Sequence, residues 1–179
     1  DMPSGLGPLL ADDRYNWAYV SEPEPHLDGR RLSHPRGKVI GGSSSINGMI
    51  YIRGHARDYD RWAQSGCKGW RYADLLPYFR RAEANARGAD AYHGAEGPLK
   101  VTAPNGDATP LGAAFIAAGV EAGYPMTPDC NGAQQEGFGP ADRTTWRGKR
   151  WSTARGYLDP ARARPNLTIV TGALALEIL

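Results

Sequence analysis

A run of small residues within positions 36–54 carries the residue types best suited to hold a cofactor or an anion. Gly41 and Gly42 remove two consecutive Cβ atoms, so the backbone can turn through positive φ or lie close to a flat or charged ligand. Three serines follow at positions 43–45. Their hydroxyls and nearby backbone N–H groups can form a donor-rich hollow for phosphate oxygens or a polar ring edge.

The spacing of the glycines and serines excludes three other motifs. A Walker loop needs Ser or Thr directly after Gly-Lys, whereas Val39 follows Gly37-Lys38. A nucleophile elbow needs Gly-x-Ser-x-Gly, but Ile46 stands where the second glycine would be. The dinucleotide fingerprint Gly-x-Gly-x-x-Gly is absent from the sequence. Any cofactor held here is therefore not held by a first Rossmann turn.

The alternative is a surface turn with solubilising serines, which is the commonest meaning of such a cluster. The residues that follow argue against it, because positions 46–52 are rich in apolar side chains and indicate a segment that enters a core. A binding loop is therefore the better interpretation.

The loop also has glycine, basic, apolar, asparagine and aromatic residues at fixed offsets. They are Gly37, Lys38, Ile40, Gly41, Gly42, Ser43, Ser44, Ile46, Asn47, Tyr51, Gly54 and Asp60. This pattern resembles the first signature of the glucose-methanol-choline (GMC) flavoprotein oxidoreductases. The segments at 15–25, 131–137 and 150–155 are similar to the bacterial choline and alcohol dehydrogenase branch, so the resemblance extends along essentially the whole chain.

The resemblance implies that residues 39–50 wrap an FAD, with Gly48 near the reactive N5 of the flavin. The implied cofactor-binding residues are Val39, Gly41, Gly42, Ser43, Ser44, Asn47, Gly48, Met49, Ile50 and, at the adenine, Ala175. Two alternatives remain: Asn47 can simply cap the following segment, and Ala175 can simply pack in a sheet.

The resemblance also bears on covalent attachment and on the catalytic base. Relatives that tether the flavin carry a histidine where this chain has Ile46, so non-covalent FAD is expected. The family's base histidine is expected in a C-terminal part beyond this sequence, so no catalytic residue is assigned here. The four histidines of the chain, among them His93, show no metal-ligand spacing and are expected to be exposed on loops.

Composition limits the other function classes. A formal net charge of +2 does not indicate a nucleic-acid partner. Cys67 and Cys130 cannot build a disulfide framework, which favours a reducing compartment. No run of about 18 apolar residues is present, so no transmembrane segment is expected. The 23 glycines and 14 prolines predict much irregular backbone.

Apolar spacing predicts the elements in the middle of the chain. Short helices are expected around residues 59–66 and 72–79, the second started or kinked by Pro77. A strand is expected at 99–102. The clearest helix covers 109–123, with a threonine cap, a proline in its first turn and a terminal glycine. Its apolar face is expected to consist of Leu111, Phe115 and Ala118.

The two ends of the chain give weaker patterns. Alternating aromatic residues predict a short strand at 15–19, and Ser152 is expected to cap a last short helix. Two strands are expected at 167–170 and 174–179.

The sequence thus predicts a partial α+β fold, rich in loops, with short helices and few strands. Residues 1–54 are expected to form the flavin-contacting extended segment and the Gly/Ser loop. Residues 55–165 are expected to form a helical and loop region, partly cap and substrate domain, and 166–179 to return as strands to the FAD-binding domain. The expectation is a fragment, inactive alone, without the leading dinucleotide-binding βαβ unit and the C-terminal catalytic part.

The implied activity is hydride transfer from an alcohol, choline-like or another primary alcohol, to N5 of FAD. A same-family alcohol oxidase that uses O₂ and a non-catalytic interaction module are the alternatives. The expected partners are a small-molecule alcohol and an electron acceptor, either a quinone, a carrier or O₂, without nucleic acid. The expected location is cytoplasmic, with peripheral association at the inner membrane as the alternative.

Overall fold

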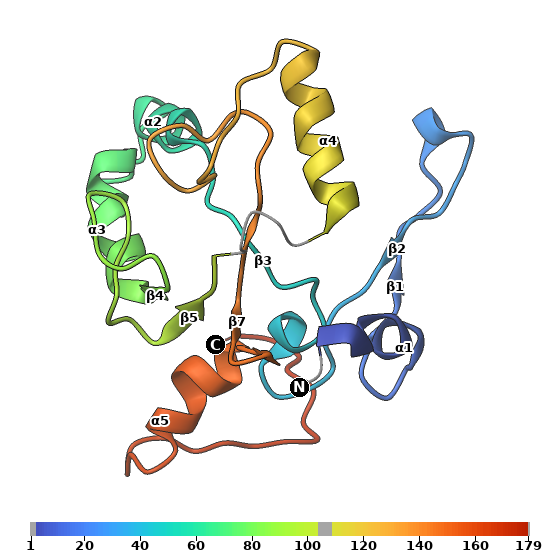
Figure 1. Ribbon diagram of the computed structural model, residues 1–179. Coiled ribbons are helices and arrows are strands. Elements are labelled where there is room, and N and C mark those ends of the chain that lie inside the picture. The colour runs from blue at the N-terminus through green and yellow to red at the C-terminus, as the bar shows by residue number, and fades with distance from the viewer. Residues whose placement is uncertain (1–2, 104–108, 179) are drawn as a thin grey trace. The chain divides into compact units, whose positions relative to one another are not determined.

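The computed structural model describes residues 3–103 and 109–178, and Figure 1 shows its helices and strands. By its internal contacts the chain divides into two compact units. We call residues 4–47 with 152–178 the loop unit, and the described residues of 48–151 the helical unit. The expected division at 54, 165 and 166 stays a prediction.

The N-terminal part of the loop unit is an extended hairpin tied down by one asparagine (Figure 1). Its elements are η1 (Pro3–Gly5), which spans the start of the unit, α1 (Leu6–Ala11), β1 (Tyr19–Val20), η2 (Pro25–Leu27), β2 (Ser33–His34) and η3 (Gly42–Ser45). Strands β1 and β2 pair antiparallel. The buried Asn16 side chain donates to the carbonyl of Leu10 at 2.8 Å and accepts from the N–H groups of Ala18 and Arg36. Of the strand predicted at 15–19, only Tyr19 lies in β1.

The C-terminal part of the loop unit contains one continuous helical stretch and then extended chain. The stretch consists of a π-helical turn, η4 (Ala154–Leu158), and α5 (Asp159–Ala161). Thr153, and not the predicted Ser152, is at the N-cap position, and it forms no side-chain cap hydrogen bond. The carbonyl of Ser152 accepts from the N–H of Gly156 at 2.9 Å.

The strands predicted at 167–170 and 174–179 are not formed among the described residues, which end at 178. A strand requires a neighbour that accepts and donates backbone hydrogen bonds. No described residue pairs with this segment in a ladder, and Leu174 and Leu176 are exposed.

Two short helices of the helical unit pack through aromatic side chains. The predicted helices are confirmed as α2 (Ala56–Gln64), followed by Gly66 at φ +108°, and α3 (Tyr72–Ala82). The Tyr59 ring lies 5.4 Å from Trp62 and 5.6 Å from Phe79 between ring centroids. Pro77 lies inside α3, not at its start, so the helix continues past a residue that has no N–H to donate.

The remaining strands of this unit are short and pair two at a time. They are β3 (Ile50–Tyr51), β4 (Glu83–Asn85), β5 (Leu99–Val101), β6 (Asp142–Arg143), β7 (Thr145–Trp146) and β8 (Lys149–Arg150). Pair β4–β5 is parallel, whereas β3–β6 and β7–β8 are antiparallel. Thr102 extends the predicted strand at 99–102 by bridging to Arg143, which connects β5 to β6. Val101 and Ala84 are buried at this junction.

Helix α4 (Pro110–Glu121) is confirmed with its predicted ends, but not with its predicted face. The Thr109 hydroxyl accepts from the N–H of Gly112 at 3.0 Å, and Gly123 follows the helix at φ +90°. The expected apolar face is exposed: Leu111 is 80% and Phe115 66% accessible. The helix packs against the ring of Phe138 through Gly119, where a Cβ would lie 2.3 Å from that ring, and through Phe115, whose ring centroid is 5.3 Å away.

Candidate functional site

The loop unit contains a cavity of about 620 Å³ beside the predicted cofactor loop. One wall consists of residues 37–41, and the other of residues 169–174. Trp17 from the hairpin and Leu158 from η4 complete the lining. More of the lining is apolar than polar. The cavity volume lies within the range of about 300–1,000 Å³ found for small-molecule pockets.

Glycines give the loop its shape. Gly41 has φ +90° and Gly42 φ +55°, a region that side chains disfavour. A Cβ on Gly41 would lie 2.5 Å from the hydroxyl of Ser45 and 3.2 Å from the Cβ of Ala154. A Cβ on Gly37 would lie 2.2 Å from the carbonyl oxygen of Gly42. Larger residues at these positions would open the loop.

The three serine hydroxyls bond mainly within the loop. The Ser44 hydroxyl donates to the carbonyl of Gly41 at 2.5 Å, and the Ser45 hydroxyl donates to that of Ile40 at 2.9 Å. The Ser43 oxygen accepts from the N–H of Gly37 at 3.2 Å. These hydroxyls therefore fix the loop conformation, and the predicted contacts of Ser43 and Ser44 with a cofactor stay predictions.

The residues after the loop differ in how deeply they are buried. In the loop unit, Ile46 is buried and Asn47 is exposed. In the helical unit, Gly48 is exposed, and a Cβ built on it would meet no described residue within 4 Å. Met49 is buried at φ +63°, and its carbonyl accepts from the N–H of Thr144 at 2.8 Å. Ile50 is 52% accessible at the start of β3.

Ala175, predicted to lie at an adenine, follows the cavity wall directly. The lining ends at Leu174, so Ala175 is one residue beyond it. Val39 and Gly41 do line the cavity, whereas Gly42, Ser43 and Ser44 do not. Two residues assigned from the sequence thus line the cavity, their contact with a cofactor stays a prediction, and the residues of the opposite wall were not assigned.

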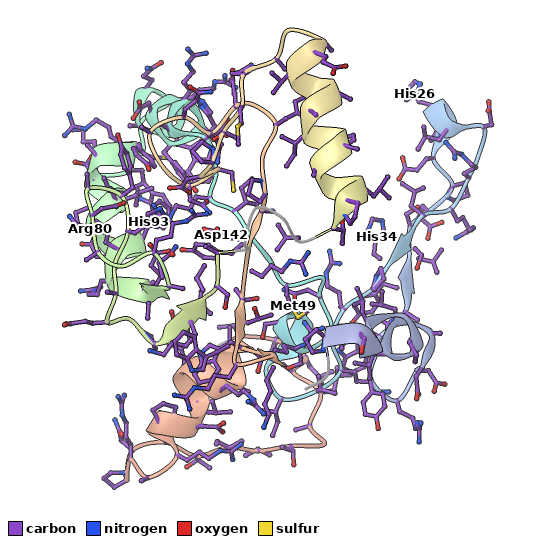
Figure 2. All side chains as sticks on the ribbon, in the orientation of Figure 1. His26, His34, Met49, Arg80, His93 and Asp142 are labelled. Carbon is purple, nitrogen blue, oxygen red and sulfur yellow. The ribbon has the colours of Figure 1, made fainter. Side chains whose placement is uncertain are left out.

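The helical unit contains a buried ion cluster around His93, which the sequence predicted to be exposed (Figure 2). The prediction is wrong because the imidazole is fully buried between two carboxylates. Its Nδ1 lies 2.8 Å from Oε1 of Glu83, and its Nε2 lies 2.8 Å from Oδ2 of Asp129. The hydrogen bond with Glu83, opposed by burial and aided by Asp129, raises the pKa of His93 to about 9.

Arg53 completes this cluster and ties a loop to strand β3. Its guanidinium lies 2.8 Å from Oε1 of Glu83 and is almost completely buried. Burial alone would raise the pKa of Glu83, but the bond from His93 and the charge of Arg53 hold it below its usual value. The backbone N–H of Arg53 donates to the side chain of Asn131 at 2.8 Å, and its carbonyl accepts from Gln135.

The cluster is structural in character. Its charges pair with one another, and the side chains of His93, Glu83 and Arg53 are buried, so no face of His93 is open to a substrate. Among the described residues, no group of three or more His, Cys, Asp or Glu side chains is arranged to hold a metal ion.

The comparison with protein families decides the assignment. The model of the GMC oxidoreductases matches residues 16–179. The chain belongs to the GMC oxidoreductase family.

Curated GMC relatives and solved structures agree with this assignment. The chain is 57% identical to the oxygen-dependent choline dehydrogenase of Sinorhizobium fredii over 94% of its own length and 31% of the relative's. It is 59% identical to the protein of that name from Yersinia pseudotuberculosis, over 99% and 32% of the two lengths. The chain therefore spans about a third of the curated relatives that it matches.

Among solved structures, pyridoxine 4-oxidase from Mesorbium loti aligns with a TM-score of 0.89 at 36% identity, over 95% of this chain and 34% of that one. An FAD-dependent oxidoreductase from Chaetomium thermophilum aligns with a TM-score of 0.76 at 29% identity, over 85% and 28%. The predicted fold class is thereby confirmed: the short helices and strands correspond to part of the GMC FAD-binding domain.

Two features of this GMC chain were not predicted from the sequence. Thr153 contacts the loop at Gly41 and Ser44 although it is 109 positions from Ser44, and its motif carried no signal of that contact. His93 has acidic partners 10 and 36 positions away, which no local pattern indicates. In the part of the chain that the structure describes, no helix is long and apolar enough to cross a membrane.

Proposed function

We propose that the protein containing this chain is an FAD-dependent oxidoreductase that acts on CH–OH groups. The observation that carries the proposal is the cavity walled by the GMC signature loop in a chain of the GMC family. The alcohol is choline-like or another primary alcohol, because the similar proteins are named for choline and pyridoxine, which are both alcohols.

The residues present fit an FAD. The cavity has room for part of a dinucleotide, and glycines at positive φ bring bare backbone to its wall. The residues proposed to hold the cofactor are Val39, Gly41, Gly42, Ser43, Ser44, Asn47, Gly48, Met49, Ile50 and Ala175. When bound, FAD supplies a hydride acceptor at N5. The open space at Gly48 supports the proposal that this position leaves room for the flavin ring.

The flavin is proposed to be held non-covalently. Ile46, at the position where flavin-tethering relatives carry a histidine, has no nucleophilic atom, and its side chain is buried. Acid precipitation of the protein should leave all flavin fluorescence in the supernatant. Flavin that stays with the precipitate would contradict this part of the proposal.

The main test uses the full-length gene product that contains this chain. After denaturation it should release FAD, identified by fluorescence and chromatography. Choline or another primary alcohol should bleach the visible flavin absorbance under anaerobic conditions. A product without flavin would favour the alternative of a non-catalytic interaction module.

The two enzymatic candidates differ in the electron acceptor that they use. The similar proteins named oxygen-dependent choline dehydrogenase and pyridoxine 4-oxidase favour an oxidase, in which O₂ accepts the electrons. A quinone or carrier is the other proposed acceptor, and a quinone fits peripheral association of a cytoplasmic enzyme with the inner membrane. Alcohol-dependent oxygen uptake compared with dye or quinone reduction distinguishes the two candidates.

No residue of this chain is proposed to abstract a proton from the alcohol. The only fully buried histidine among the described residues, His93, is enclosed by Glu83 and Asp129. The base is proposed to be a histidine outside this sequence, as the family resemblance implies.

A further inference from the structure

We infer that Thr153 is a positioning residue for the cofactor loop. It acts through Gly41 and Ser44 and fixes the wall of the 620 Å³ cavity. The inference rests on the proposed binding of FAD and adds a residue that does not itself line the cavity.

The backbone N–H and the hydroxyl of Thr153 each form a hydrogen bond with the loop. The backbone N–H of Thr153 donates to the Ser44 hydroxyl oxygen at 2.9 Å, and that hydroxyl donates to the carbonyl of Gly41 at 2.5 Å. The Thr153 hydroxyl lies 3.2 Å from the same carbonyl and 3.0 Å from the Ser44 hydroxyl. A carbonyl oxygen has two lone pairs, so Gly41 can accept from both hydroxyls at once.

Close packing reinforces these bonds. A Cβ on Gly41 would lie 3.2 Å from the Cβ and 3.4 Å from the N of Ala154, so the loop backbone rests directly on the start of η4. Leu158, at the other end of η4, lines the cavity together with residues 37–41. Thr153 therefore connects the loop wall to the helical turn that carries another part of the lining.

The expected effect of this connection is pre-organisation. Glycine at positive φ loses much conformational freedom when it is fixed, and a loop that is fixed beforehand loses less freedom when a ligand binds. The peptide between Gly41 and Gly42 is held at its carbonyl by the two hydroxyls and at its N–H by the carbonyl of Val39. Loss of the Thr153 hydroxyl should weaken FAD binding by about two- to tenfold, the factor that the net contribution of one hydrogen bond represents.

The experiment compares variants of the full-length protein. Thr153→Val and Thr153→Ala remove the hydroxyl but keep the backbone N–H, whereas Thr153→Ser keeps the hydroxyl. Thr168→Val is the matched control, since Thr168 is exposed in the same unit and lies outside the cavity lining. The dissociation constant of FAD is measured by titration of the apoprotein, alongside its thermal midpoint without FAD.

Two results support the inference together. Thr153→Val and Thr153→Ala should weaken FAD binding, and Thr153→Ser and Thr168→Val should bind as the wild type does. Should one hydroxyl-free variant fail to fold, the other carries the comparison with Thr153→Ser.

Other results overturn it. Binding by the valine and alanine variants that equals the wild type excludes a positioning role. So does equally weak binding by Thr153→Ser, because the hydroxyl would then be irrelevant. A wild type that binds no FAD instead refutes the proposed function, so the two failures are distinguishable.

Discussion

Single backbone positions constrain the loop at residues 37–45, which is proposed to hold the cofactor. At Gly41 the conformation favours glycine and the space is tight, since φ is +90° and a Cβ would lie 2.5 Å from the Ser45 hydroxyl and 3.2 Å from the Cβ of Ala154. Gly29 shares the positive φ, at +70°, but a Cβ there would meet no described residue within 4 Å. Alanine substitutions at these two glycines therefore distinguish the cost of the backbone conformation from the cost of crowding.

Replacement of Gly41 by alanine should destabilise the loop by about 1–3 kcal/mol from positive φ, with a further cost from the crowded Cβ. Gly29→Ala should carry only the first of these costs and should keep FAD. Flavin content per protein, measured after gel filtration of both full-length variants, checks the prediction. Full FAD content in Gly41→Ala would contradict it.

His93 makes stability depend on pH through its two carboxylate partners. Its pKa is raised to about 9 in the folded state, against about 6.5 for an unperturbed histidine in the unfolded chain. The protonated form therefore stabilises the fold fully below about pH 6.5, and this stabilisation is lost as the pH rises through 9. The difference corresponds to about 3 kcal/mol at most.

His93→Gln should be less stable than the wild type near neutral pH, and its stability should decline less between pH 6.5 and 9.5. The urea midpoints of the full-length variant and wild type at both pH values measure this difference. His26→Gln, at an exposed position in the hairpin, is the control (Figure 2). A parallel decline in His93→Gln and wild type would show that His93 is not the group responsible.

At the scale of elements, helices with local signals were predictable and elements that depend on distant partners were not. Helix α4 has Thr109 as its cap and Gly123 after its end, and α2 ends before Gly66, so short-range chemistry sets their bounds. Among the described residues, which end at 178, the strands expected at 167–170 and 174–179 are not formed, because strand pairing needs a second segment that the local sequence does not reveal.

The same distinction applies to the candidate site. The small residues drew attention to Gly41, and the family resemblance added Val39; both line the cavity. The contacts of Thr153, and the burial of His93, arise from tertiary packing across long sequence separations. The apolar spacing of Leu111 and Phe115 also did not lead to burial, because Phe115 contacts Phe138 and both residues still stay largely exposed.

The cap of α4 gives a prediction at this scale. Thr109→Ala removes the hydroxyl that accepts from the N–H of Gly112 and should destabilise the start of the helix by about 1 kcal/mol. Amide hydrogen exchange in the first turn should accelerate by roughly fivefold, since exchange there follows local opening. Thr109→Ser retains the acceptor and should exchange as the wild type does. Unchanged exchange in Thr109→Ala would show that the cap contributes little.

At the scale of the whole chain, the described residues bury little apolar surface. Their buried hydrophobic side chains are Ile46, Met49, Ala84 and Val101, whereas large side chains such as Phe115, Leu176 and Ile178 are exposed. Burial of apolar surface is the main favourable contribution to folding, and extensive exposed apolar surface marks a contact with another surface. The chain spans about a third of the length of its curated relatives, which agrees with a need for further contacts.

The 179-residue chain, expressed by itself, should therefore neither retain FAD nor unfold cooperatively. Purified from cells and passed through gel filtration, it should show no visible flavin absorbance, and its thermal unfolding followed by near-ultraviolet circular dichroism should be broad. The full-length product, treated in the same way, is the control and should keep its flavin and unfold in a sharp transition. A flavin spectrum that co-elutes with the isolated chain would mean that the cavity between residues 37–41 and 169–174 suffices to hold the cofactor without further protein surface.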